Sequence, residues 1–527
     1  MKRNYLRIFI ILICILLLSS CSPKQTGTQF VKVNGTGFSE GNQPYTIKSI
    51  SVSTDETFIP SEQDYQTIRE LGFNAVRLHL DYKLFEDDAQ PYIYLQKGWD
   101  LLERHISYAK KNDIKILMNM HVPQGGYQSG GKGTALWTEP ENQDRLAELW
   151  GAIAKKYADE TAVLGYGLVN EPFPCAPDVK TGQKYWSDLA GKLAERIRYV
   201  DQNHILFAEV VSGITDGEGN PQNVVFTAAE HYGYPELEDA NVAYEFHMYD
   251  PYAFTHQVTA EAGTSNKPYT SYPNEFITAS ENQKYVEDAY RGGSLDVSNL
   301  QEQTITSELI SLDGSKPRFF QTGIAVISEQ AGGNVWLTSL RVDEYDQNRN
   351  LVRNVLKLDM DTPETFLIWT GGDAAYSDYD PANKAVHLQS LYSMYSAVLN
   401  EASIPVKKGN FYQVKAAVRA SGFGPGSEIR PFINVYECDS YKVLNKNYLL
   451  SQMNMRMQFG LVFGKAMFLG EFGAAEVTYS PERGGQQWIQ DMRSLAEEKG
   501  LSYNYFAYND GYFDIDRSRW NGSGGGR

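Results

Sequence analysis

The run Gly165-Tyr-Gly-Leu-Val-Asn-Glu-Pro172 carries the pattern that decides the fold of this chain. An apolar stretch typical of a buried strand ends in a carboxylate, Glu171, and then turns at a proline. The run Phe468-Leu-Gly-Glu-Phe-Gly473 repeats the pattern and carries Glu471. A half-buried charge costs free energy unless it is paired, so neither glutamate is explained by stability. Two carboxylic acids that face one pocket are the arrangement that glycoside hydrolysis needs.

Strand-like stretches alternate with amphipathic helical segments along most of the chain. The alternation indicates parallel strands with helices outside, and eight such units close into a barrel. We therefore expect an α/β fold, a (β/α)8 TIM barrel. The expected strands are residues 45–52, 74–80, 114–121, 162–170, 205–209, 242–247, 466–471 and 501–506.

One interval is too long for a barrel unit, which averages about 30 residues. Successive strand ends from Arg77 to His247 lie 38 to 50 residues apart, whereas His247 and Glu471 are separated by 224 residues. Within this interval, short alternating strands and glycine-rich turns replace the helical periodicity. They predict an inserted all-β sandwich, jelly-roll-like, between barrel strands 6 and 7. We place it at residues 292–442.

The N-terminus has the features of a bacterial lipoprotein signal. Three basic residues precede an apolar run at residues 8–18, which is too short to cross a bilayer, and Leu18-Ser-Ser-Cys21 resembles a lipobox. We expect a signal peptide at 1–20, lipid on Cys21 and a tether at 21–29, so that the protein is anchored in the bacterial cell envelope, at the outer membrane or cell surface. An ordinary signal peptide cleaved nearby is the alternative. The barrel then occupies 30–291 and 443–520, and 521–527 form a disordered tail.

Charge and cysteine content narrow the classes of partner. The net charge of −17 becomes −20 once the three basic residues of the signal are removed, which excludes nucleic acid and favours a neutral polymer. The 13% aromatic content suits stacking on sugar rings, and equally a large aromatic core. Cys175 and Cys438 remain in the mature chain without metal-site spacing; one bridge is possible, but two free thiols are favoured. We expect a monomer.

Polar residues stand at the ends of the expected strands, on the face where barrels place catalysis. The pieces that carry them resemble glycoside hydrolase family 5, the cellulase-like retaining enzymes, and they occur in that family's order. The matching pieces are Val76-Arg-Leu78, Met120-His121, Asn170-Glu171-Pro172, Phe246-His-Met-Tyr-Asp-Pro-Tyr252 and Leu469-Gly-Glu-Phe-Gly473.

The resemblance implies a retaining hydrolase of β-linked polysaccharide or oligosaccharide, endo-β-glucanase-like or mannanase-like, without a cofactor. Glu471 would be the nucleophile and Glu171 the acid/base, while Asn170 would bond the sugar 2-OH. We expect Arg77 to lower the pKa of Glu471 and Glu171 to keep a raised pKa. His247 and Tyr249 could donate hydrogen bonds to Glu471.

Other interpretations remain open for the supporting residues. Arg77 could pair with a structural acid, His121 could be a core histidine, and His247 and Tyr249 could follow a strand by coincidence. Glu209 also ends a strand, but the family does not use that position as a catalytic acid, so we treat it as structural or secondary.

Two aromatic positions and the question of a metal complete the expected site. Phe506 stands where the family usually has a tryptophan whose ring lies beneath the sugar. Phenylalanine offers a smaller apolar face for stacking and no N–H donor. Trp137, in a long loop, is either a sugar platform or a packing residue. His79 and Asp81 form no dense ligand cluster, so we expect no metal.

Two further function classes use the same features. A non-catalytic, glycan-binding surface lipoprotein would keep the barrel as a scaffold, and a transglycosylase would use identical residues. The insert resembles a carbohydrate-binding module, in which Trp336, Trp369, Tyr376 or Tyr379 could stack on a glycan, although core packing is expected for at least two of them.

Overall fold

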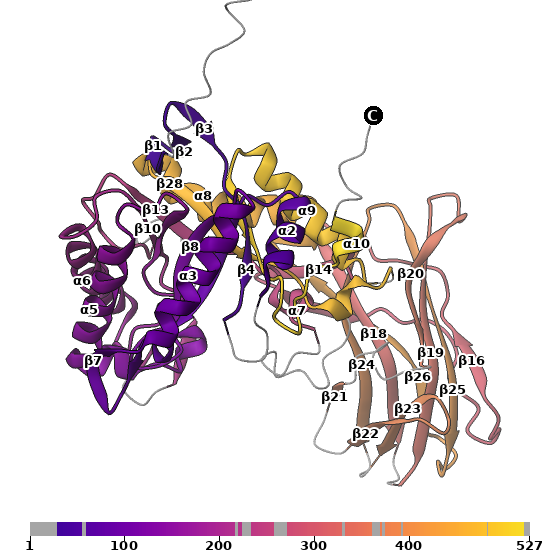
Figure 1. Cartoon of the computed structure of the whole chain (residues 1–527). Coiled ribbons are helices and arrows are strands. Elements are labelled where there is room, and N and C mark those ends of the chain that lie inside the picture. Colours follow the sequence, from indigo (N-terminus) through magenta and orange to yellow (C-terminus); the bar gives the residue numbers. More distant parts are fainter. Residues whose placement is uncertain are drawn as a thin grey trace, which may run out of the picture.

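The computed structural model describes most of the mature chain (Figure 1). Described are residues 29–520 without 55–59, 217–219, 224–232, 258–270, 329–331, 361–368, 372–374, 391–393 and 482. The expected signal peptide, Cys21, nearly all of the tether, and the tail at 521–527 therefore lie outside the described residues. None of the described helices is both long and apolar enough to span a membrane.

Eight described strands close into a parallel barrel, which confirms the predicted fold class. Hydrogen bonding joins each strand to the next in chain order, and the last strand pairs with the first. The strands are β4 (Lys48–Val52), β5 (Ala75–Asp81), β8 (Lys115–Val122), β9 (Val163–Gly167), β10 (Ile205–Glu209), β13 (Val242–His247), β28 (Ala466–Phe472) and β29 (Ser502–Tyr505).

Helices cover the outside of the barrel, and local sequence sets their ends. Ser61 and Asp64 form a reciprocal capping box at the start of the first helix, and Asp178 caps α6 by accepting a hydrogen bond from Thr181 N–H. Gly464, at φ +61°, ends α8 in the left-handed conformation that glycine adopts easily. The helices are α2 (Glu62–Glu70), α3 (Gln96–Lys111), α4 (Ala135–Thr138), α5 (Pro140–Tyr157), α6 (Val179–Arg198), α7 (Tyr252–Thr255), α8 (Lys446–Phe463), α9 (Gly485–Glu498) and α10 (Arg517–Trp520).

A small three-stranded antiparallel sheet closes the N-terminal end of the barrel. It consists of β1 (Val31–Asn34), β2 (Gly37–Glu40) and β3 (Gln43–Tyr45). Val31 and Phe38 pack against apolar side chains at the starts of the barrel strands, including Phe207 and Phe468. The barrel interior is therefore apolar at this end, and polar groups gather at the opposite, C-terminal end. Two further pairs, β6 (Glu86–Asp87) with β7 (Gln90–Tyr94) and β11 (Gly213–Thr215) with β12 (Pro221–Asn223), lie in the loops.

The chain between β13 and β28 forms two antiparallel sheets beside the barrel (Figure 1), as predicted for an inserted sandwich. A shared core of side chains from both sheets holds them together. One sheet contains β15 (Lys284–Asp288), β26 (Glu428–Glu437), β18 (Arg318–Ser328), β24 (Met394–Pro405), β14 (Asn274–Glu281), β27 (Ser440–Leu444) and β21 (Trp369–Gly371). The other contains β16 (Gln303–Thr306), β25 (Phe411–Ser421), β19 (Asn334–Tyr345), β23 (Ala385–Ser390), β22 (Ala375–Asp380), β17 (Ile310–Ser311) and β20 (Leu351–Asp359).

The insert begins earlier than the predicted residue 292. β14 and β15 precede that boundary yet belong to the first sheet, and β14 pairs with β27, the last strand of the insert. Asn274 lies opposite Leu444 in this pair, so the chain enters and leaves the insert side by side. The helix α8 follows at once.

Asn504 bridges two neighbours in the closed barrel, and its loss should weaken the fold. Its side-chain amide donates to Ser51 Oγ and to the carbonyl of Gly470, each at 2.8 Å, in a fully buried position. Asn504→Ala should lower the free energy of unfolding by about 1–3 kcal/mol, because the Ser51 hydroxyl and the Gly470 carbonyl, both buried, lose their hydrogen-bond donor. Chemical denaturation measures this change. The control Asn454→Ala, at an exposed position of α8, should change it by less than about 0.5 kcal/mol; equal effects would contradict the assignment.

Candidate active site

Eight of the predicted site residues meet at the C-terminal end of the barrel, each delivered by a strand or by the turn after it. Arg77 lies in β5, His121 in β8, His247 in β13 and Glu471 in β28. Asn170 and Glu171 follow β9, and Tyr249 follows β13. Phe506 directly follows β29 and lines the same cavity.

The two predicted catalytic carboxyls are neighbours. One oxygen of Glu171, one oxygen of Glu471 and a ring nitrogen of His247 all lie within 4.8 Å of one another. His247 Nδ1 is 2.9 Å from Glu171 Oε1 and 3.4 Å from Glu471 Oε2. Residues separated by three hundred positions in sequence thus face a single gap.

Arg77 is the centre of the buried charges beneath this gap. Its guanidinium, which is fully buried, contacts Glu471 Oε1 at 2.6 Å, Glu209 Oε1 at 2.7 Å and Glu245 Oε1 at 2.8 Å. It also donates to Asn170 Oδ1 at 3.1 Å. Arg77 therefore pairs with the nucleophile candidate and with structural acids at the same time, so the two interpretations of this residue both hold.

Glu209 has a larger role than its sequence position indicates. Its Oε2 accepts a 2.6 Å hydrogen bond from the backbone N–H of Glu171. Glu171 has φ +44°, a left-handed conformation that is strained for a residue with a side chain. This hydrogen bond, donated by Glu171 N–H to Glu209, supports the conformation and so orients the Glu171 side chain.

Glu245 is a site residue that sequence reasoning missed. It lies two residues before His247 in β13, so both side chains project to the same side of the strand. Its carboxylate is fully buried and contacts Arg77, and one oxygen lies 3.5 Å from His247 Nε2. The i, i+2 spacing from His247 was the available signal.

The pKa shifts of the two catalytic candidates are opposite in direction to those predicted. Burial raises the pKa of Glu171, but the hydrogen bond and positive charge of His247 outweigh it and bring that pKa to about 2. Burial raises the pKa of Glu471 above its ordinary value, against the charges of His247 and Arg77. The prediction failed because His247 makes its shorter contact with Glu171 rather than with Glu471.

His247 holds the proton that Glu171 lacks. Burial lowers the pKa of His247, yet the charges of Glu209 and Glu471 and the hydrogen bond to Glu171 raise it well above its ordinary value. The imidazolium lies between the catalytic pair and the deeper pair Glu209 and Glu245. His247 can pass its Nδ1 proton to Glu171, and the pair can therefore deliver one proton to the cavity.

A cavity of about 1190 Å³ opens above these groups. Glu171, Glu471, Asn170, His121 and Tyr249 line it, and Tyr249 donates a 2.8 Å hydrogen bond to Glu471 Oε2 as predicted. Further aromatic lining comes from Tyr127, Phe173, Tyr252, Phe506, Tyr512 and Phe513. Its volume exceeds the 300–1,000 Å³ typical of small-molecule pockets, so it can hold several sugar rings.

Trp137 is not a sugar platform. Its ring is 9% exposed and packs edge-on against Trp186, and its Nε1–H donates to Gln128 Oε1 at 2.7 Å. It does not line the cavity. The loop folds the indole inward because its N–H finds a buried acceptor there, so the packing interpretation is correct.

The insert contributes none of its described residues to the cavity lining. In the sandwich, the Trp336 ring stacks on His387 at 5.0 Å and has the Arg419 guanidinium 4.5 Å from its centroid, so protein groups already occupy it. Tyr379 packs on the insert core. The side chains of Trp369 and Tyr376 lie outside the described residues. Cys175 and Cys438 are both free thiols.

Comparisons with known proteins agree with this geometry. Residues 33–293 match the family model of cellulase (glycosyl hydrolase family 5). This part of the chain belongs to the family. The chain is 28% identical over 223 residues to Endoglucanase C of Acetivibrio thermocellus, and this alignment covers 42% of this chain and 60% of the relative. It is 26% identical over 198 residues to Cellodextrinase A of Ruminococcus flavefaciens, covering 37% and 53%.

The family 5 match therefore covers the barrel strands β4 to β13 and also the first two strands of the insert, β14 and β15. The chain spans about 60% or less of the length of these relatives. A solved structure of endoglucanase Cel5A from Thermotoga maritima is 12% identical, covers 90% of this chain and 95% of its own, and has a TM-score of 0.44.

Glu209 should make the stability of the fold depend on pH. Burial and the charge of Glu245 raise the pKa of Glu209 to about 7, against an ordinary value of 4.5. Between these values the folded protein binds the proton more tightly than the unfolded chain, so this contribution to stability is present below pH 4.5 and is lost as pH rises through 7. Glutamine stays neutral at every pH. Between pH 4.5 and 8, the free energy of unfolding of Glu209→Gln should therefore rise above that of the parent protein by up to about 3 kcal/mol.

Denaturation curves at several pH values measure this difference. The matched control is Glu236→Gln at an exposed glutamate, which should not reproduce this gain. A difference for Glu209→Gln that is flat from pH 4.5 to 8 would show that Glu209 titrates normally.

Proposed function

We propose that this family 5 member is a retaining glycoside hydrolase of β-linked polysaccharide or oligosaccharide, with Glu471 as nucleophile and Glu171 as acid/base. The observation that carries the proposal is the approach of Glu171 and Glu471 oxygens to within 4.8 Å around one imidazole. Retaining enzymes hold their two carboxyls about 5–5.5 Å apart, whereas inverting enzymes leave about 6.5–9.5 Å for a water molecule.

In the first step, Glu471 attacks the anomeric carbon and the bond to the leaving oxygen breaks. Arg77 at 2.6 Å and the Tyr249 hydroxyl at 2.8 Å stabilise the negative charge of the carboxylate and fix its orientation. The leaving oxygen takes a proton from Glu171, which receives the Nδ1 proton of His247 across their 2.9 Å hydrogen bond. His247 then becomes neutral as the negative charge of Glu471 is lost to the ester.

In the second step, water attacks the glycosyl ester and releases the sugar with its original configuration. Glu171 accepts the water proton and can pass it back to His247 Nδ1, which restores the starting state. Glu209 and Glu245 favour this return because their negative charge stabilises the imidazolium. Asn170 is held by Arg77 and by Asn119 at the cavity wall, where it can bond the sugar 2-OH.

The substrate class follows from the cavity and the relatives. The cavity volume and aromatic lining suit a chain of pyranose rings, whose flat C–H faces stack on aromatic side chains. The relatives named above are an endoglucanase and a cellodextrinase. We infer a β-glucan or a related neutral β-glycan.

Covalent trapping tests the proposal. A 2,4-dinitrophenyl 2-deoxy-2-fluoro-β-glycoside should leave a glycosyl adduct on the peptide that contains Glu471, detected by mass spectrometry, and Glu471→Ala should abolish it. Glu171→Ala should lose about 10²–10⁴-fold in kcat on a glycoside with a poor leaving group. It should lose little in adduct formation from the activated glycoside, and azide should rescue its turnover as the β-glycosyl azide.

Glu236→Ala, at an exposed glutamate, is the control and should label like the parent protein. Absence of any adduct across gluco-, manno- and xylo-configured reagents would instead favour a non-catalytic glycan-binding protein.

We also propose that lipid on Cys21 anchors the protein in the bacterial envelope. The support is the basic, apolar and lipobox sequence of residues 1–21. Cys21→Ser should move the protein from the membrane fraction to the soluble fraction, and mass spectrometry of the parent N-terminus should show a diacylglyceryl cysteine. An unmodified N-terminus elsewhere would indicate an ordinary signal peptide.

A further inference from the structure

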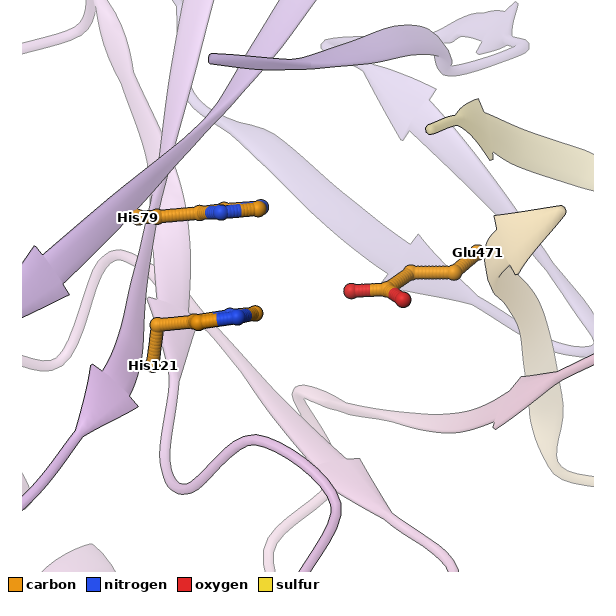
Figure 2. Close-up of side chains that lie close together, drawn as sticks. All are labelled: His79, His121 and Glu471. Atoms are coloured by element: carbon orange, nitrogen blue, oxygen red, sulfur yellow. The ribbon is translucent and has the colours of Figure 1, made fainter. Parts of the chain in front are cut away.

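His79 stands on the same strand as Arg77 and joins a stack of rings in the cavity wall. Its imidazole is parallel to that of His121, with centroids 4.0 Å apart and planes 4° apart. It also stacks on Phe506 at 5.7 Å and 24°. Figure 2 shows both imidazoles edge-on, directed toward the Glu471 carboxylate. The stack fixes the direction of the His79 ring without using its nitrogens.

The His79 ring has a polar atom without a protein partner. The residue lines the cavity and is 8% exposed, and its Nε2 has no hydrogen-bond partner in the described part of the chain. A buried polar atom left unpaired costs about 1–3 kcal/mol. Such an atom in a cavity wall is accounted for if a ligand supplies the missing partner.

His79 and Glu471 line the same cavity, and the distance between their polar atoms suits one bridging oxygen atom. A ring nitrogen of His79 and an oxygen of Glu471 lie within 4.8 Å but form no hydrogen bond with each other. An oxygen placed between them would be within hydrogen-bonding distance of both. A sugar that is attacked by Glu471 must bring its own hydroxyl groups into this space.

The chemistry of the ring favours a hydroxyl over a cation. Burial, together with the charges of His121, Arg77 and His247, lowers the pKa of His79 well below its ordinary value. Neutral imidazole has one donor and one acceptor, which matches a hydroxyl group. A metal ion needs ligand lone pairs that converge, whereas two rings stacked 4° from parallel direct theirs side by side.

We propose that His79 is a substrate-binding residue whose ring nitrogen hydrogen-bonds a hydroxyl of the sugar that lies against Glu471. The proposal rests on the proposed function and adds a specificity contact to it. His79 supplies a polar contact beside Phe506, whose ring has no N–H group. The ligand it selects is a neutral pyranose that carries a hydroxyl at that ring position.

His79→Phe tests the contact because phenylalanine can keep the ring stack and has no nitrogen. kcat/KM is measured for the non-fluorinated aryl β-glycoside of the configuration that labels Glu471, and for its 2-, 3-, 4- and 6-deoxy analogues. The variant should lose about 10- to 100-fold on the parent glycoside and on all analogues but one. On the analogue that lacks the contacted hydroxyl, it should lose less than about threefold.

Equal losses on all five substrates would overturn the proposal, because His79 would then only shape the cavity, and no loss on any would overturn it as well. The amount of adduct formed on Glu471 gives the concentration of competent active sites, so kcat/KM is corrected for any misfolded fraction of a variant. His79→Gln provides a second variant. His387→Phe replaces a stacked histidine of the insert and should change none of the values. Failure of the proposed function would show in the parent protein as absence of the adduct.

Discussion

The buried guanidinium of Arg77 is the interaction on which the site depends. It meets carboxylates from three different strands, β10, β13 and β28, at 2.6 to 2.8 Å. A buried arginine without partners would be prohibitive, and so would three buried carboxylates. Each charge is tolerated because the others are present, so the positions of these strand ends are coupled. The orientation of the nucleophile candidate is thereby tied to the closure of the barrel.

A single arginine cannot balance the four carboxylates, and this excess determines where the proton resides. His247 is the second cation, and it lies between the upper pair, Glu171 and Glu471, and the lower pair, Glu209 and Glu245. The acid of the site is therefore shared between imidazole and carboxyl. A raised pKa of Glu171 itself, the usual pattern for a general acid, is not required when a charged imidazole sits 2.9 Å away.

The sequence predicted the barrel, the inserted sandwich and the pair Glu171 and Glu471, because strand periodicity and strand-end chemistry are local signals. It did not predict Glu245, whose carboxylate stands within an apolar strand and forms an ion pair with an arginine from a strand far away in the sequence. The sequence also could not predict which carboxylate His247 contacts more closely, because oxygens of Glu171 and Glu471 lie within 4.8 Å of each other and the choice depends on tertiary geometry. The start of the insert was missed because β14 and β15 pair with strands from its end, at a long sequence separation.

The three-stranded sheet β1–β3 covers the end of the barrel opposite the cavity, and its Val31 and Phe38 pack on the starts of the barrel strands. The chain thus joins the folded body one strand length away from the cavity mouth. Coupling the protein to a bead through its N-terminal segment would leave the mouth turned to the bulk solution. Long, stiff polymer chains could then reach it without passing the solid support.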